Sequence, residues 1–173
     1  MNDDNHIGVC FVGSTNSLVD STDCADFNDW LREVLYFLID KEYCTRFIFR
    51  NIRGFEASCI RAILEALRED QIVKRIEFLE GNADFMLIVS EDGQIDQEID
   101  AGKMKVDEIM TGSFKFPLTL SPYPVPGDER SKICEMIDLA SYMVSSLSHD
   151  EPEDRFYLDY AKAHNIMCYN WRG

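Results

Sequence analysis

Short apolar runs alternate along this chain with stretches in which apolar residues recur every three or four positions. Residues 7–13, IGVCFVG, are almost continuously apolar, as in a strand covered on both faces within a parallel sheet. Helical spacing follows at 26–39, a second short strand at 46–49, a second helix at 55–67 and a third strand at 75–80. This order predicts an α/β fold, specifically a Rossmann-like, doubly wound, mostly parallel sheet in three layers.

The second half of the chain is less regular. Residues 84–99, DFMLIVSEDGQIDQEI, predict a hairpin that turns at 91–93, within an irregular insertion of about 80–117. The stretch 118–129 then holds three prolines and a glycine, so we expect a strand that leads into a rigid loop. The remaining expected elements are a helix at 129–140, a strand at 142–147, a helix at 154–164 and a strand at 166–171. No repeat or linker interrupts this series, which favours a single domain spanning 1–173.

Charge and cysteine content narrow the classes of partner. The chain has 17 Lys and Arg against 32 Asp and Glu, a formal net charge of -15, which disfavours nucleic acid and anionic membrane as partners. A basic protein partner or a homo-oligomer stays compatible with that charge. The six cysteines form no C-x-x-C pair and no cluster at metal spacing, so we expect reduced thiols, no metal and no cofactor. The chain shows no signal-peptide pattern and no apolar run of about 18 residues, and we expect a cytoplasmic protein.

Polar turns follow three of the expected strands. In an open parallel sheet, ligands lie outside the carboxyl ends of the strands, where neighbouring crossovers go to opposite faces. Gly13, Ser14 and Thr15 follow the first strand. The hydroxyls of Ser14 and Thr15 could donate to a phosphate or sugar. Residues 148–153 follow the penultimate strand. The alternative is that these hydroxyls satisfy the backbone of their own turns.

The second strand breaks sharply into its helix in the stretch 47–67, FIFRNIRGFEASCIRAILEAL. Arg50, Asn51 and Arg53 occupy the junction, and two guanidinium groups beside a helix N-terminus predict a site for a phosphate or carboxylate. Gly54 suits the tight turn because it tolerates positive φ, and Glu56 in the first helical turn complements the helix dipole. The alternative is that the arginines pair with acidic side chains.

Four segments in a fixed order carry a resemblance to a known family. They are FVGS at 11–14, the stretch 47–67, SPYPVPGDERSKICEMIDLASYMVSSL at 121–147 and FYLDYAKAHNIMCYNW at 156–171. Together they resemble the SLOG superfamily of Rossmann-like proteins, which includes the DNA-processing A proteins, the Lonely Guy phosphoribohydrolases and the small YpsA-like bacterial proteins. The likeness is closest to the YpsA-like group and covers most of the chain outside about 80–117.

Individual motifs match this family pattern while its glycine motifs are degenerate. Residues 54–56 stand where the family has Gly-Phe-Asp, 136–138 match its Met-Ile-Asp, and 158–162 stand for its Leu-Glu-Tyr-Ala-Lys helix. The family's glycine pair is replaced by Arg50-Asn51, and its second glycine-rich turn by Pro152-Glu153, where an acid would repel phosphate. The Pro-Gly-Gly-x-Gly-Thr-x-x-Glu signature of the phosphoribohydrolases is missing from the sequence.

The resemblance implies a noncatalytic module that binds or senses a nucleotide or a nucleotide-derived ligand. Its expected ligand-binding residues are Gly13, Ser14, Thr15, Arg50, Asn51, Arg53, Gly54 and Glu56. One alternative is a nucleoside monophosphate N-glycosidase, for which Glu56 and Asp159 are the carboxylates at family positions. Another is an acidic protein-interaction domain with a vestigial pocket. No nucleophile–base pair is evident in the sequence, so no catalytic residue is assigned.

Overall fold

The computed structural model describes residues 7–14, 25–51, 54–66, 84–90, 100 and 119–171 of the chain. Its strands are β1 (Ile7–Gly13), β2 (Cys44–Phe49), β3 (Asp84–Ser90), β4 (Thr119–Val125), β5 (Tyr142–Ser146) and β6 (Met167–Asn170). Its helices are α1 (Ala25–Tyr36), a short π-helical segment η1 (Phe37–Lys41), α2 (Phe55–Ala66), α5 (Glu129–Leu139) and α6 (Pro152–Ala163). No helix within these ranges is long and apolar enough to cross a membrane.

The six strands form one sheet in the order β4-β3-β2-β1-β5-β6, and each neighbouring pair is parallel. The order runs outward from β1 in both directions, so it reverses between β1 and β5. The predicted Rossmann-like α/β fold is therefore confirmed. Since all six strands are parallel, their carboxyl ends lie along the same rim of the sheet. The turns that follow β1, β2 and β5 all begin at this rim.

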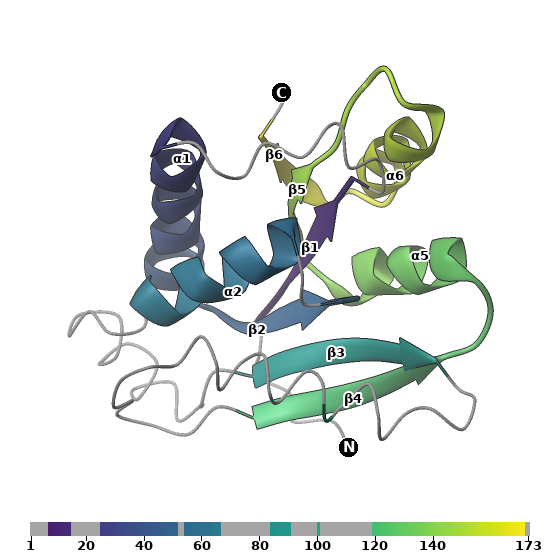
Figure 1. Ribbon diagram of the computed structural model, residues 1–173, viewed down its shortest axis with the longest axis horizontal. Helices are drawn as coiled ribbons and strands as arrows, with labels where there is room; N and C mark the ends of the chain where they lie inside the picture. The colour runs from purple at the N-terminus through teal and green to yellow at the C-terminus, as the bar shows by residue number, and fades with distance from the viewer. Residues whose placement is uncertain are drawn as a thin grey trace.

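Two helical layers cover the sheet (Figure 1). Helices α1 and α2 pack together on one face, and α5 and α6 pack together on the other. The first face buries a set of aromatic rings, in which Phe11 and Phe49 stack at 4.8 Å between centroids. The second face buries Met136, Met143 and Tyr157. A fully buried side chain of this size contributes about 1.5–3 kcal/mol, so these two cores provide much of the driving force for folding.

Strand β3 differs from the expectation for its part of the chain. The sequence predicts a hairpin arm over these residues, but β3 pairs in parallel with β2 on one side and with β4 on the other. Because β3 is an interior strand, its run from Phe85 to Val89 is buried on both faces of the sheet. The expected turn at 91–93, the second hairpin arm and the expected strand at 75–80 lie outside the described residues.

Strand β4 confirms the expected strand that leads into a loop, and the structure shows where the one ends and the other begins. Pro122 and Pro124 lie within the strand, and the loop begins at Pro126. β4 tolerates prolines because it is an edge strand of the described sheet, and both exposed prolines can direct their hydrogen-free nitrogen away from β3. Pro122 and Pro124 therefore hinder the pairing of a further strand with β4. They do not disturb the hydrogen bonds between β4 and β3.

The two helices on the second face begin in different ways. Asp128 caps α5 by accepting a hydrogen bond from the Ser131 N–H at 3.0 Å. Helix α6 begins at Pro152, two residues before the predicted start, because a proline suits the first helical position, where no N–H partner is needed.

Candidate functional site

The carboxyl ends of β1 and β5 meet where the strand order reverses, which is where ligands bind in open α/β sheets. Gly13 pairs in register with Ser146, and the Ser14 N–H donates to the Ser146 carbonyl oxygen at 3.1 Å. The turn after the first strand is thus joined to the end of β5. The structure places two of the predicted residues, Gly13 and Ser14, at this position.

Gly13 is required by the close packing of α2 on β1. A Cβ atom at this position would lie 2.8 Å from the Phe55 Cβ and 3.2 Å from the Glu56 Oε1. The helix can approach this closely because the preceding turn passes through Gly54, whose φ of 59° lies in the left-handed region. The lack of a side chain at Gly13 therefore serves helix–strand packing, and Gly54 has the turn role that the sequence predicts.

Arg50 links three parts of the chain at this rim. Its Nε donates to Glu56 Oε2 at 3.2 Å, and its NH2 group donates to the Gly13 carbonyl oxygen at 2.9 Å. Its NH1 group donates to Glu129, at the start of α5. Glu56 Oε2 also accepts a bond from the Gly13 N–H at 3.3 Å. Gly13, Arg50, Glu56 and Glu129 form what we call the rim cluster.

In the rim cluster, burial and neighbouring charges shift the pKa values of the ionisable side chains in opposite directions. The side chains of Arg50 and Glu56 are only 7% and 4% exposed. Burial raises the pKa of the Glu56 carboxyl, although Arg50 and the Gly13 N–H act to lower it. Burial would lower the pKa of Arg50, but Glu56 and Glu129 more than offset this and raise it. With one cation against two carboxylates, the cluster is not an open anion site, and Arg50 is paired with acids, as in the sequence-based alternative.

A different polar group at the rim has no partner. The Ser146 hydroxyl is buried, the residue being 2% exposed, and its Oγ has no hydrogen-bond partner in the described part of the chain. Leaving a buried hydroxyl unpaired costs about 1–3 kcal/mol. In its register with Gly13, Ser146 lies at the reversal of strand order. Ser146 could not be predicted as a site residue because nothing in the local sequence distinguishes it from Ser145.

Two acidic residues in the first turn of α6 have different partners. The buried Asp154 accepts a bond from the Ser148 N–H at 3.0 Å and so fixes the turn. Glu153 accepts two bonds from Arg130, at 3.2 and 2.6 Å, and one from the Tyr157 hydroxyl at 2.6 Å. Arg130 and Tyr157 lower the pKa of Glu153, and the pairing offsets the charge that the sequence analysis expects to repel a phosphate.

The predicted site residues separate into three groups. Five of them surround the end of β1 or the start of α2: Gly13, Ser14, Arg50, Gly54 and Glu56. Asn51 is half-buried directly after Arg50, and Thr15 and Arg53 lie outside the described residues.

Asp159, the second candidate carboxylate, lies on α6 beside a groove along β6, on the opposite face of the sheet from Glu56. Glu129 could not be predicted as a partner because 79 residues separate it from Arg50.

The three thiols that the structure places in the buried core between the sheet and its helices are shielded from solvent. Cys10, Cys44 and Cys59 are buried and unbonded to one another, and burial raises the pKa of Cys44 to about 12. Across the residues with described positions, no group of three His, Cys, Asp or Glu side chains is placed to hold a metal ion.

Comparison with known proteins adds no family assignment. No protein-family model matches the chain, and no curated protein matches it. The class of protein therefore rests on the fold and the rim: an open, doubly wound α/β protein with a buried, unpaired hydroxyl at the reversal of its strand order. The SLOG resemblance stays a prediction.

Proposed function

We propose that the protein is a noncatalytic module that binds a nucleotide or a nucleotide-derived ligand at the junction of β1 and β5. The observation that carries this proposal is the unpaired Ser146 hydroxyl. It lies beside Gly13, at the position where doubly wound sheets bind ligands. A ligand group that pairs with this hydroxyl removes the cost of leaving it unsatisfied.

The charges at the rim favour a particular part of the ligand. The rim cluster carries one guanidinium against two carboxylates, so it does not favour a phosphate. A sugar hydroxyl or a base edge is neutral and can pair with the Ser146 hydroxyl, which both donates and accepts. We therefore propose that the nucleoside part of the ligand lies over Ser146. The predicted phosphate contacts at Thr15 and Arg53 stay predictions, since both residues lie outside the described part of the chain.

The bonds of Glu56 support binding without catalysis. A catalytic carboxylate needs hydrogen-bonding capacity left for water or substrate, but Glu56 Oε2 already accepts bonds from the Gly13 N–H and from Arg50, in contrast to the unpaired Ser146 hydroxyl. Asp159 lies on α6, on the other face of the sheet from Glu56. Two carboxylates on opposite faces do not flank one scissile bond, as a glycosidase requires. The geometry therefore favours the binding module over the N-glycosidase.

Isothermal titration calorimetry with nucleosides, nucleoside monophosphates, cyclic nucleotides and ADP-ribose-type compounds tests the proposal. We expect at least one compound to bind the wild-type protein and to bind Ser146→Ala at least tenfold more weakly. Ser145→Ala is the matched control, because Ser145 is the preceding residue in β5 and its hydroxyl bonds Asn170 at 2.8 Å. Silence across the whole panel, or equal weakening in both variants, contradicts a ligand contact at Ser146.

A further inference from the structure

The face of the sheet on which Ser146 lies also carries Trp171. Ser145 pairs in register with Asn170, and its hydroxyl donates to the Asn170 Oδ1 at 2.8 Å, so these two side chains share one face. Side chains alternate between the faces along a strand, so the next residues, Ser146 and Trp171, share the other face. Trp171 accordingly packs against the core beneath α1 and α2, and its N–H donates to the Ser145 carbonyl oxygen at 2.8 Å.

Three aromatic rings meet on this face of the sheet. The Trp171 ring lies 5.4 Å from Phe27, edge to face, and 5.4 Å from Trp30, measured between centroids. Phe27 and Trp30 lie 5.9 Å apart, and Phe27 also contacts Phe55, which packs on the end of β1. We call Phe27, Trp30 and Trp171 the aromatic wall. It lies on the same face as the unpaired Ser146 hydroxyl, at the same carboxyl rim.

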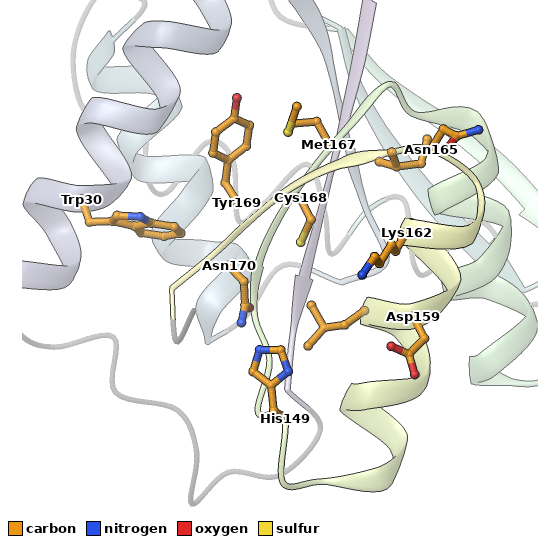
Figure 2. Close-up of a pocket in the computed structure, with 11 residues that line it drawn as sticks. Trp30, His149, Asp159, Lys162, Asn165, Met167, Cys168, Tyr169 and Asn170 are labelled. Atoms are coloured by element: carbon orange, nitrogen blue, oxygen red, sulfur yellow. The ribbon is translucent and has the colours of Figure 1, made fainter.

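Two members of the aromatic wall are accessible in part. Phe27 is fully buried, whereas Trp30 and Trp171 are only partly buried. Trp30 also lines a groove of about 740 Å³, together with Asn170 at the end of β6 and His149 beyond the end of β5. Figure 2 shows these three side chains around one hollow. The volume suits a small ligand, which can reach the aromatic wall from this groove.

The chemistry of the aromatic wall suits one part of a nucleotide. Aromatic side chains stack on the flat face of a base, and every base has such a face. A sugar has no flat face, and a phosphate is disfavoured both by apolar surroundings and by the carboxylates of the rim cluster. Neighbouring strands lie about 4.8 Å apart, so one small molecule can contact both Trp171 and Ser146.

We infer that the base of the ligand, rather than its sugar or its phosphate, is the group that this rim recognises. The base stacks on Trp171, and its polar edge pairs with the Ser146 hydroxyl, which both donates and accepts. This inference rests on the proposed function, which places the nucleoside part of the ligand over Ser146. It adds the recognised group and a specificity-determining residue, Trp171. A compound that has the sugar and the phosphate but no base is then excluded.

Tryptophan fluorescence reports on the aromatic wall directly, because Trp30 and Trp171 are the only two tryptophans of the chain. The probes are the monophosphates of adenosine, guanosine, cytidine and uridine, their free bases, and ribose 5-phosphate, each added to the full chain. Free tryptophan in solution corrects for light that the bases absorb. We expect at least one monophosphate and its free base to quench the emission. Calorimetry should show that ribose 5-phosphate binds at least tenfold more weakly than that monophosphate.

Substitutions at Trp171 test the stacking ring. Trp171→Leu keeps an apolar side chain but loses the ring, and it should weaken binding of the monophosphate at least tenfold. Trp171→Phe keeps a ring and should retain more of the affinity than Trp171→Leu. Phe156→Leu is the control, because Phe156 is a partly buried aromatic residue on the opposite face, and it should leave the affinity unchanged. If Trp171→Leu does not fold, quenching in the wild-type protein and the ribose 5-phosphate comparison decide the question.

The outcomes separate this inference from the proposed function. A monophosphate that loses affinity in Ser146→Ala, but binds Trp171→Leu as tightly as the wild-type protein, overturns the inference and leaves the ligand site in place. Binding without any change in tryptophan emission, or equal binding of ribose 5-phosphate, does the same. Failure of every compound to bind overturns the proposed function and this inference with it.

Discussion

At the carboxyl end of β1, the polar groups on its two sides differ in whether they have hydrogen-bond partners. On the β2 side, the Arg50 guanidinium bonds Glu56, Glu129 and the Gly13 carbonyl oxygen. On the β5 side, the buried Ser146 hydroxyl has no partner in the described part of the chain. The first side contains the residue types that a sequence reader associates with phosphate binding, but the protein itself satisfies them. The comparison teaches that residue type alone does not show whether a polar group at the rim is satisfied, because the charged Arg50 is fully paired and the neutral Ser146 hydroxyl is not.

The largest expected effect is on the β2 side. Arg50→Met leaves the buried Glu56 carboxylate without a cation, and we expect the free energy of unfolding to fall by about 3–5 kcal/mol in urea denaturation. Glu129→Gln is the control, because Glu129 contacts the same arginine but is 51% exposed, and it should cost less than about 1 kcal/mol. Equal losses in the two variants would mean that the rim cluster is not a buried ion pair.

A double variant sharpens the same comparison. Arg50→Met combined with Glu56→Leu removes both buried charges, so it should recover most of the stability lost in Arg50→Met alone. This recovery distinguishes the cost of an uncompensated charge from the loss of packing around Arg50. A double variant as unstable as the sum of its single changes would contradict it.

A smaller effect is expected at Gly13. Gly13→Ala places a Cβ atom 2.8 Å from the Phe55 Cβ, so α2 must shift, and we expect a loss of about 1–3 kcal/mol in thermal or urea unfolding. Gly8→Ala is a control in the same strand, where the nearest atom to the new Cβ is the end of a side chain, the Ile48 Cδ1 at 3.3 Å. We expect the smaller loss at Gly8. The reverse order would show that α2 does not pack on Gly13 as described.

The β5 side should respond in the opposite direction. Ser146→Ala removes an unpaired buried hydroxyl, so the free energy of unfolding without ligand should stay level or rise by up to about 1 kcal/mol. Ser145→Ala breaks the bond to Asn170 and should lower it by about 0.5–1.5 kcal/mol. Urea denaturation of the ligand-free proteins compares them. A greater loss at Ser146 than at Ser145 would show that the Ser146 hydroxyl is already satisfied.

The smallest effect concerns pH. The pKa of Glu153 is lower in the folded protein than in the unfolded chain, chiefly because Arg130 donates to it. Its contribution is complete above the unfolded carboxyl pKa of about 4.3 and is lost as pH falls through the lower, folded value. Since both partners are well exposed and solvent screens their attraction, we expect this to be the smallest of the effects on stability. Urea denaturation from neutral pH to about pH 3 measures this effect. The free energy of unfolding should fall less steeply with pH in Glu153→Gln and in Arg130→Gln than in the wild-type protein. Parallel curves for the variants and the wild-type protein would contradict the pairing.

The sequence predicts most of the fold because its signals are local. Apolar runs and helical spacing place β1, β2, α1, α2 and the later elements close to their observed positions, and Gly54 marks the turn before α2. The interior role of β3 could not be predicted in this way. A buried apolar run followed by a glycine-containing turn resembles a hairpin arm, and only its pairing with β2 and β4 distinguishes the two.

The sequence by itself determined the kind of sheet and which turns follow the carboxyl ends of its strands, because apolar runs and helical periodicity are properties of neighbouring residues. Only the tertiary structure decided what the polar residues at that edge do. Arg50 meets Glu129 across 79 residues, and Ser146 differs from Ser145 solely in the face of β5 that it occupies and the partner it lacks. Whether a buried polar group is satisfied depends on atoms brought together from distant segments, and local sequence patterns carry no record of that pairing.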